Sequence, residues 1–449
     1  MKTRKTIVAT LSMLALALSA NSVHAEMTQA EIDRLGKDLT PTGAEKAGNK
    51  EGTIPEWQGG LTKPPAGWKP EEGYADPFAG EKPLFVITAQ NAEQHKDKLS
   101  AGMLAMLKKY PTFSMPVYPS HRTFAMPQSV YESTKAQAGK VKSEGTSIKN
   151  FTLPGTPFPQ PQNGVEAMYN HLLRYFGAYN RCSDWLPVKA NGDYYRVGFC
   201  EDMVQGQNFT PAQKKAFLFF GLYDAPATLV GTIYLVHDPL DYTVEKREAW
   251  IYNAGQRRVR RAPDLAYDNI DDGTEGMATT DDYWGFHGAM DRYDFKLLGK
   301  KEMYVPYNAY KLSSPKLKYK DMVEKGHLKS DLMRYELHRV RVVEATLKPG
   351  ASHVVAKRVF YIDEDSNLIA LADGYDGRGN LWRAYSYPLM QAYDVPLMFQ
   401  AAYIGHDLNN GTYIVRGLTN ERKQPATVWN SKAKMDDFTV DAIRRRGTR

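Results

Sequence analysis

Histidine, serine and carboxylate side chains occur in this chain without the spacings that most catalytic or metal sites need. Ten histidines are scattered, and none belongs to an H-E-x-x-H motif, which holds zinc on one face of a helix. No G-x-S-x-G motif occurs, which excludes the nucleophile elbow of α/β-hydrolases. Adjacent carboxylates occur at Asp271-Asp272 and Asp281-Asp282, in polar stretches where solvated charge is the default. The motifs therefore predict no catalytic residue, no metal site and no cofactor.

Two short motifs are similar to ligand-binding loops but lack parts of them. The run D-x-D-x-N at 363–367 is similar to the start of a calcium-binding loop, yet Leu368 replaces the required glycine and Gly374 the final glutamate. We therefore interpret 363–367 as a solvated turn. The glycines at 374–379 lie between two predicted strands, so they do not lead into a helix N-terminus that would bind a phosphate.

The densest charge in the chain is an arginine cluster made of Arg257, Arg258, Arg260 and Arg261. Such a cluster is a candidate contact for anionic lipid head groups or for an acidic partner. The alternative is a solvated strand whose long side chains cover apolar surface. The net charge of the whole chain is only +7, which does not indicate a nucleic-acid-binding protein.

The two cysteines, Cys182 and Cys200, flank a predicted β-hairpin. With a three-residue loop at 190–192, the two cysteines lie opposite each other. A two-residue loop at Asn191-Gly192 would shift the register by one residue and separate them. In an oxidising compartment the first register predicts a disulfide, and the alternative is a pair of unrelated buried thiols.

These residues need elements to position them, and the clearest element is a predicted β-meander at 334–387. Its strands are separated by turn-forming runs of about five residues, which makes neighbouring strands antiparallel. In the runs 359–362 and 368–372 both faces are apolar, whereas an antiparallel sheet usually keeps one face polar. Each face must therefore be covered, or one face must line an apolar cavity. The predicted strands are Arg334–Leu347, His353–Ile362, Leu368–Tyr375 and Leu381–Tyr387.

A second strand pair is also strongly apolar. Thr228–His237 is predicted to pair with Tyr242–Tyr252 across a short polar turn. Two aromatic residues share one face of the second strand, so they either pack into a core or line a cavity. As candidates for the lining of a ligand pocket we take Trp250, Tyr252, Tyr234 and Leu371.

The N-terminal part is predicted to wrap the sheet. The run Thr40–Pro70 is rich in proline and glycine, which excludes a long helix or a central strand. Its Ile54, Trp57 and Trp68 are costly to leave in water, so an extended arm laid over the body fits better than a free linker. Helices are predicted at Gln29–Leu39, Thr88–Tyr110, Gln128–Gln137, Gly164–Phe176, Pro211–Leu222, Asp281–Tyr293 and Asp436–Arg446.

The first residues have the features of a secretory signal peptide. Lys2, Arg4 and Lys5 precede the apolar run Ile7–Ala20, and Val23-His24-Ala25 offers small residues for cleavage after residue 25. The apolar run is too short to span a bilayer, and no later stretch reaches that length. No cysteine stands near the cleavage point, so we expect an exported protein without a lipid anchor.

Four stretches resemble a proteobacterial family, the domain of unknown function 1329. They are Leu39–Asn49 (LTPTGAEKAGN), Glu248–Pro263 (EAWIYNAGQRRVRRAP), Lys357–Asp365 (KRVFYIDED) and Gly374–Gly379 (GYDGRG). The resemblance covers nearly the whole mature chain. It implies an enlarged relative of the LolA/LolB lipoprotein carriers, whose curved antiparallel sheets enclose an apolar pocket for acyl chains. It brings no catalytic motif and no site residues to transfer, and this chain lacks the lipid-anchoring cysteine of LolB.

Residues and resemblance together predict a mainly β (α+β) fold. It is a large curved antiparallel sheet or half-open barrel, similar to LolA/LolB, with covering helices and an extended N-terminal arm. After a signal peptide at 1–25, we expect a wrapping segment at 26–160 and a sheet domain at 161–449. The first functional hypothesis is non-catalytic binding or shuttling of a hydrophobic, lipid-like molecule in the periplasm, peripheral to the outer membrane. The resemblance implies an RND-type exporter and an outer-membrane protein as partners.

Two other functions fit the sequence. An interaction subunit of an envelope export complex would hold no ligand, so an apolar cavity would argue against it. A hydrolase of lipids or sterol-like molecules would need clustered Ser, His and Asp side chains, or paired carboxylates, inside that cavity.

Overall fold

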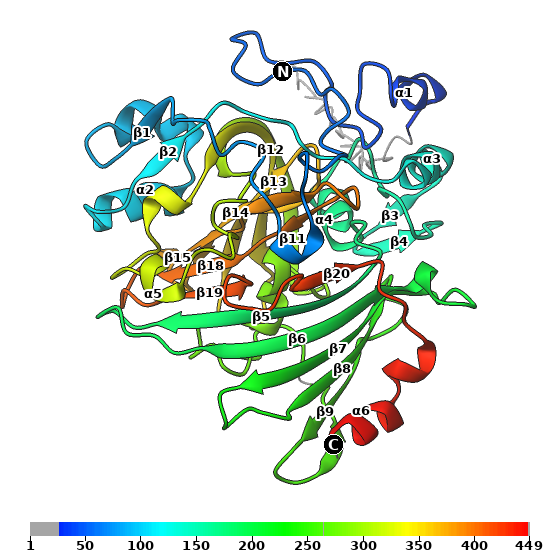
Figure 1. The fold of residues 1–449 in the computed structure, drawn as a ribbon. Helices are drawn as coiled ribbons and strands as arrows, with labels where there is room; N and C mark the ends of the chain where they lie inside the picture. Colours follow the sequence, from blue (N-terminus) through cyan, green and yellow to red (C-terminus); the bar gives the residue numbers. More distant parts are fainter. Residues whose placement is uncertain (1–26, 264, 448–449) are drawn as a thin grey trace, which may run out of the picture.

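The structure, a computed structural model, describes residues 27–263 and 265–447. The predicted signal peptide at 1–25 lies outside the described residues. Within the described ranges, no helix combines the length and the apolar character that crossing a bilayer requires. One curved sheet dominates the molecule, and short helices lie on its faces and at its ends (Figure 1).

The sheet has 16 strands in the order β1-β2-β12-β13-β14-β15-β18-β19-β5-β6-β7-β8-β9-β10, with β11 beside β12 and β20 beside β5. Its described pairings are antiparallel except for one parallel contact of β2 with β12. The predicted fold class, a mainly β fold built on a large curved antiparallel sheet, is confirmed. Its strands are β1 (Phe85–Ile87), β2 (Met115–Val117), β5 (Ala178–Val188), β6 (Val197–Gln205), β7 (Lys215–Ala225), β8 (Ile233–Pro239), β9 (Glu248–Asn253), β10 (Arg258–Arg261), β11 (Tyr293–Pro306), β12 (Tyr335–Leu347), β13 (Lys357–Asp363), β14 (Ile369–Tyr375), β15 (Leu381–Ser386), β18 (Tyr403–Asp407), β19 (Tyr413–Leu418) and β20 (Thr427–Trp429). Two small hairpins stand apart: β3 (Lys142–Glu144) with β4 (Ser147–Lys149), and β16 (Leu389–Ala392) with β17 (Leu397–Gln400).

The helices are short. The α-helices are α1 (Gln29–Arg34), α2 (Ala101–Lys109), α3 (Gln128–Gln137), α4 (Gly164–Leu172), α5 (Tyr319–Met322) and α6 (Val440–Gly447). The 3-10 helices are η1 (Pro70–Glu72), η2 (Ala92–Lys98), η3 (Gly206–Asn208), η4 (Thr280–Gly285), η5 (Ser330–Leu332) and η6 (Met435–Phe438). The prediction of Gln128–Gln137 is confirmed as α3. The single helix predicted at Thr88–Tyr110 is instead η2 followed by α2, because Ser100 caps a new helix by accepting a hydrogen bond from Met103 N at 3.1 Å.

Two other helix predictions are wrong. Pro211–Leu222 contains most of strand β7, in which consecutive Phe and Leu residues point to opposite faces, and both faces are apolar and covered. A strand buried on both faces has no polar alternation to reveal it. Asp281–Tyr293 contains no helix beyond the short 3-10 helix η4, because Trp284 adopts a left-handed backbone (φ +52°) that ends regular helix there.

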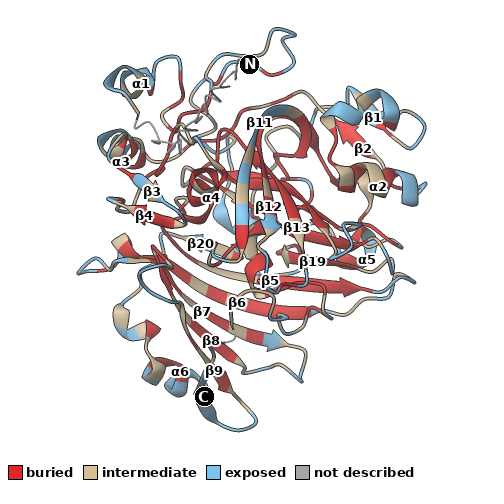
Figure 2. Ribbon diagram, turned by 180° about the vertical axis from the view of Figure 1, so that it is seen from behind, coloured by how far each residue is buried: buried red, intermediate tan, exposed pale blue. Residues whose placement is uncertain are grey.

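The predicted meander is confirmed as β12 to β15, and both of its faces are covered. In β12, Val340 and Val342 belong to one apolar core, whereas Val343 and Ala345 belong to another. Helix α2 packs over β14 and β15 on the first side, and α4 packs over β11 and β12 on the second. Buried residues accordingly follow β12 and β13 along their length (Figure 2). In this half of the sheet, both faces are therefore filled by protein.

The cysteine hairpin is confirmed as β5 and β6. Lys189 N donates to Asp193 O at 2.8 Å, which gives the loop its three-residue form. In that register Cys182 lies opposite Cys200, and the two form a disulfide.

The proline- and glycine-rich arm lies against the body. Trp57 donates its Nε1 to Phe124 O at 2.9 Å. Gly60 has φ +75° and lies so close to Phe124 that an added Cβ would come within 2.1 Å of its carbonyl oxygen. Strands β1 and β2, inside the predicted wrapping segment, join the main sheet through the β2–β12 contact. The division at residues 160 and 161 stays a prediction.

Candidate functional site

The second half of the sheet, β5 to β9, has two apolar faces with different covers. One face packs against the C-terminal elements, where Leu218, Phe220 and Tyr252 share a core with Phe438 and Ile443 (Figure 1). The other face lies under the described residues 262–263 and 265–287, which we call the cover segment. A cavity of about 220 Å³ remains between this face and the cover segment.

Aromatic and aliphatic side chains form most of the cavity wall. Every second residue of a strand points to the same face, and this alternation brings the wall together from β6 to β9. Tyr234 of β8 lies beside Ile251 of β9 in the sheet register. The sheet contributes Phe199, Phe217, Phe219, Tyr234, Val236 and Ile251. The cover segment contributes Leu265, Ile270, Tyr283 and Trp284.

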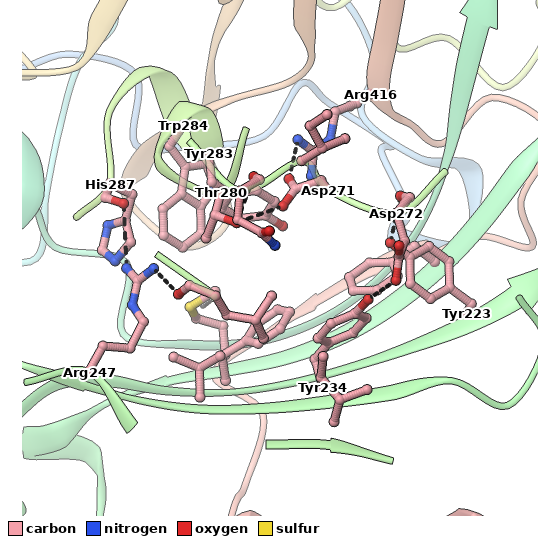
Figure 3. Close-up of a pocket in the computed structure, with 18 of the residues that line it drawn as sticks. Tyr223, Tyr234, Arg247, Asp271, Asp272, Thr280, Tyr283, Trp284, His287 and Arg416 are labelled. Carbon is pink, nitrogen blue, oxygen red and sulfur yellow. Dashed lines mark hydrogen bonds and ion pairs between the residues drawn. The ribbon is translucent and has the colours of Figure 1, made fainter. Parts of the chain in front are cut away.

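The cover segment is held in place by local hydrogen bonds instead of regular strands. Ile270 and Thr279 form an isolated antiparallel bridge. Thr279 begins η4 with a capping box, in which the Asp282 carboxylate accepts a hydrogen bond from the Thr279 backbone N–H at 3.2 Å. Two consecutive aromatic residues, Tyr283 and Trp284, then line the cavity (Figure 3).

One group of polar contacts ties the cover segment to β8 and β19. The Tyr234 hydroxyl donates to the Asp272 carboxylate. Asp271 accepts from Arg416 Nη1 at 3.0 Å and from Thr280 Oγ1 at 3.3 Å (Figure 3). Burial raises the pKa of Asp271, and the Arg416 guanidinium opposes that rise. Both carboxylates are therefore already engaged by groups of the protein.

A second polar group is centred on Asp238 of β8. Its carboxylate accepts from Arg247 Nε at 2.7 Å and from His287 Nε2 at 2.6 Å. Burial opposes the charge of Asp238, but Arg247 and His287 outweigh burial and hold its pKa well below the usual range. Burial lowers the pKa of His287, although Asp238 acts against it. The result is an ionised aspartate that orients a neutral imidazole at the cavity wall.

Residues 86–444 match the family described as "Protein of unknown function (DUF1329)". The chain belongs to the DUF1329 family. The family resemblance stated from the sequence is confirmed. The uncharacterized protein PA3922 of Pseudomonas aeruginosa is 46% identical over 459 residues, and the match covers 100% of both chains.

Two solved structures are similar to part of this DUF1329 chain. One is a DUF1329 family protein from Desulfovibrio piger, with 15% identity, a TM-score of 0.42, and coverage of 63% of this chain and 100% of that chain. The other is the LolA superfamily protein NE2245 from Nitrosomonas europaea, with 11% identity, a TM-score of 0.38, and coverage of 63% and 99%. Family membership rests on the sequence matches.

In this DUF1329 protein the four predicted pocket residues occupy three different places. Tyr234 lines the cavity. Trp250 and Tyr252 lie on the opposite face of β9, and Tyr252 donates its hydroxyl to Gly447 O at 2.9 Å. Leu371 lies in the core under α2. The physical reason is register, because Ile251 and not its two neighbours shares a face with Tyr234.

The predicted arginine cluster lies at the edge of the sheet. Arg258, Arg260 and Arg261 belong to β10, which follows the turn that holds Arg257. Arg261 donates to Glu248 at 2.7 Å and its guanidinium lies 5.8 Å from the ring centre of Trp250. The role of the cluster in a charged contact stays a prediction.

The acidic turn at 363–367 is buried, so its interpretation as a solvated turn is wrong. Asp365 is 3% exposed and accepts from Arg122 at 2.7 and 2.8 Å. His338, Asp363 and Asp365 offer ligand atoms within 4.8 Å of one another, as a metal ion would need. Arg122 already neutralises Asp365, however, and both of its oxygens are engaged. This turn therefore acts as an anchor for the arm.

Sequence reasoning also missed the cover segment. Asp281 and Asp282, taken as solvated, are 3% and 2% exposed, and Asp281 accepts two hydrogen bonds of 3.0 Å from Arg358. A usable signal was present in the strands. Arg416 stands in an otherwise apolar strand, and Arg358 directly precedes the apolar run Val359–Ile362. A buried arginine in such a place requires a carboxylate from elsewhere in the chain.

A larger cleft of about 560 Å³ lies between residues 72–81, which follow the arm, and residues 308–334 of the body. It differs from the apolar cavity because charged side chains form much of its wall. They are Glu72, Asp76, Glu81, Lys311, Lys316 and Arg334.

Proposed function

We propose that this protein binds a hydrophobic, lipid-like molecule in the cavity between β5–β9 and the cover segment, as a non-catalytic carrier in the periplasm. The observation that supports the proposal is the cavity itself, which is walled by aromatic and aliphatic side chains. The disulfide Cys182–Cys200 supports an oxidising compartment such as the periplasm.

The volume of the cavity limits the size of the ligand that it can bind. A volume of about 220 Å³ holds about seven groups of water or methylene size, at ~30 Å³ each. Burial of seven methylenes contributes roughly 6 kcal/mol at ~0.8 kcal/mol each. That corresponds to a dissociation constant in the range of tens of micromolar before the costs of association. The ligand is therefore a chain of about eight carbons, or the end of a longer one.

The charges at the wall favour a ligand whose buried part is neutral. Asp271 is paired with Arg416, Asp272 with Tyr234, and Asp238 with Arg247. A carboxylate or phosphate inside the cavity would have to break one of these pairs to find a cation. The polar head group of an amphiphile would instead remain at the mouth, near the exposed Asp272.

A chain-length series tests the proposal. Binding of straight-chain alcohols with six to sixteen carbons is measured by displacement of a fluorescent probe. Affinity should rise about fourfold per methylene until about eight carbons and then level off. Val236→Trp fills the cavity and should abolish binding, whereas Val428→Trp adds the same side chain at an exposed strand position and should not. Absence of saturable binding in the native protein, or equal binding by Val236→Trp, contradicts the proposal.

The predicted alternative of a ligand-free interaction subunit gives a distinct result in the same series, since no alcohol would bind. The RND-type exporter and the outer-membrane partner implied by the family resemblance belong to this proposal. Co-purification of the exporter with the native protein, and its dependence on a loaded cavity, would test that partnership.

A hydrolase is the second candidate function, and one observation favours it. An ionised aspartate orienting a neutral histidine is the arrangement of a general base, and His287 lines the cavity. The described wall offers Thr280 as its only aliphatic hydroxyl, and the single proton of that hydroxyl is shared between Asn269 O at 3.1 Å and Asp271 at 3.3 Å. Short-chain p-nitrophenyl esters test this candidate. Turnover that His287→Gln removes would support a hydrolase and contradict a purely binding role.

A further inference from the structure

The edge of the sheet at β10 carries three arginines for which the described residues provide no counter-charge. Arg257, Arg258 and Arg260 are exposed, and none of the three forms an ion pair or a side-chain hydrogen bond with a described residue. Arg261 differs from them, because it pairs with Glu248 and lies over Trp250. The arginine cluster thus divides into one structural member and three charges that no described residue pairs.

The unpaired arginines adjoin the cavity. In the register of β9 and β10, Arg260 lies opposite Ile251 and Arg258 lies opposite Asn253. Residues opposite each other in a sheet project from the same face, and Ile251 lines the cavity. Arg258 and Arg260 therefore extend the cavity-lining face at its outer edge. The chain then continues directly into the cover segment.

Two exposed apolar side chains lie on segments that border the cavity or the turn before β10. Ile270 of the cover segment lines the cavity and is 58% exposed. Val230, in the loop between β7 and β8, is 49% exposed. That loop touches the turn before β10, since a Cβ on Gly231 would lie 3.1 Å from Ala254 Cβ. The rim made of Val230, Ile270, Arg257, Arg258 and Arg260 is called the basic rim below.

We propose that the basic rim docks the protein on an anionic lipid surface, with the mouth of the cavity turned toward the bilayer. This inference rests on the proposed function and names the surface with which the cavity exchanges its ligand. Arginines alone on an edge strand would be explained by protection against strand pairing. Protection of an edge does not require exposed valine and isoleucine beside it. Cations flanking exposed apolar side chains instead match the boundary between lipid head groups and acyl chains.

Sedimentation with vesicles tests the docking. The full-length mature protein is mixed with vesicles of phosphatidylcholine containing 30% phosphatidylglycerol or none. Each arginine near an anionic surface contributes roughly fivefold in affinity, so the triple variant Arg257→Gln/Arg258→Gln/Arg260→Gln should bind the anionic vesicles about 100-fold more weakly. The matched control Lys37→Gln/Lys50→Gln/Lys63→Gln removes the same charge from exposed positions in the arm and just before it, and should bind as the native protein does.

Three outcomes overturn the inference: no binding of the native protein to anionic vesicles at low salt, equal loss in the triple variant and the control, or equal binding to neutral vesicles. Val230→Ser should weaken binding that persists at high salt, because it removes apolar contact and leaves the charge unchanged. Alcohol binding in solution is measured on the same variants. Native-like alcohol binding by the arginine variant separates a failure of docking from a failure of the cavity.

Discussion

Removing the Arg122 side chain should release the N-terminal arm from the body. Arg122 is buried, and its guanidinium forms a bidentate pair with Asp365 at 2.7 and 2.8 Å. The same guanidinium donates to four arm carbonyls: Glu45 O at 2.7 Å, Lys46 O at 2.8 Å, Pro55 O at 3.2 Å and Ala47 O at 3.4 Å. One side chain therefore joins the arm to the acidic turn between β13 and β14.

The magnitude follows from what Arg122→Ala leaves behind. Asp365, at 3% exposure, loses its ion-pair partner, and four carbonyl oxygens lose a charged donor. Breaking a buried ion pair by removal of one partner costs about 3–5 kcal/mol. In a cooperative unit of this length, ~1 kcal/mol shifts Tm by roughly 1 °C, so the expected fall in Tm is roughly 3–5 °C. The free energy needed to open the arm alone, without unfolding the body, should fall by the same amount.

Chymotrypsin measures that local opening, since the arm contains Trp57 and Trp68. Cleavage in the arm should become faster by more than 100-fold in Arg122→Ala if cleavage follows the population of the open form. Arg34→Ala is the matched control, because Arg34 also pairs with an aspartate, Asp38, but at 51% side-chain exposure. An exposed pair contributes about 0–1 kcal/mol, so this control should change little. Equal cleavage of native protein and Arg122→Ala would refute the reasoning.

Three other predictions concern stability. Replacing Cys182 and Cys200 with alanine should cost about 3 kcal/mol in urea unfolding, from the entropy of a loop spanning 18 residues; an unchanged midpoint would contradict this. Burial, then Asp365, raises the pKa of Asp363 to about 6 from 3.8, so its ionisation destabilises the fold as pH rises through that range. Asp363→Asn should therefore stabilise at pH 7 and have no effect at pH 4, and a loss at pH 7 would contradict it. Burial raises the pKa of Asp373 to about 6 as well. Asp373→Asn should nevertheless destabilise the protein by about 1–3 kcal/mol at pH 7, because both carboxylate oxygens accept hydrogen bonds from backbone N–H groups of α2. A variant as stable as the native protein would contradict this.

Turn signals and residue patterns in the sequence were sufficient to predict the parts of the fold in which strands pair with their neighbours in the chain. The turn runs between the meander strands and the loop at 190–192 fix antiparallel pairing and register within a few residues. The same rules predicted a strand at Trp250, but they did not determine which face of that strand lines the cavity. That choice depends on the cover segment and on α6, which come from distant parts of the sequence.

The buried charges were beyond local rules for the same reason. Asp365 and its partner Arg122 are 243 residues apart, and Asp281 and Arg358 are 77 apart. An acidic run between strands has the same composition whether water or arginine surrounds it. Only a tertiary partner distinguishes the two cases, so the composition of 363–367 pointed to solvent when the fold had placed an arginine there.

The cavity exists because polar contacts hold the cover segment at a distance from the sheet. On the α6 face of β7 to β9 the covering side chains are apolar, and they settle into the sheet as a packed core. On the opposite face the cover segment is anchored through Asp271 to Arg416, through Asp272 to Tyr234, and through His287 to Asp238. Each anchor fixes the length of a polar contact and would be broken by closer approach, at the cost of an unpaired buried group. The apolar residues between the anchors therefore cannot close the gap, and a guest with apolar surface can occupy it without displacing any charge.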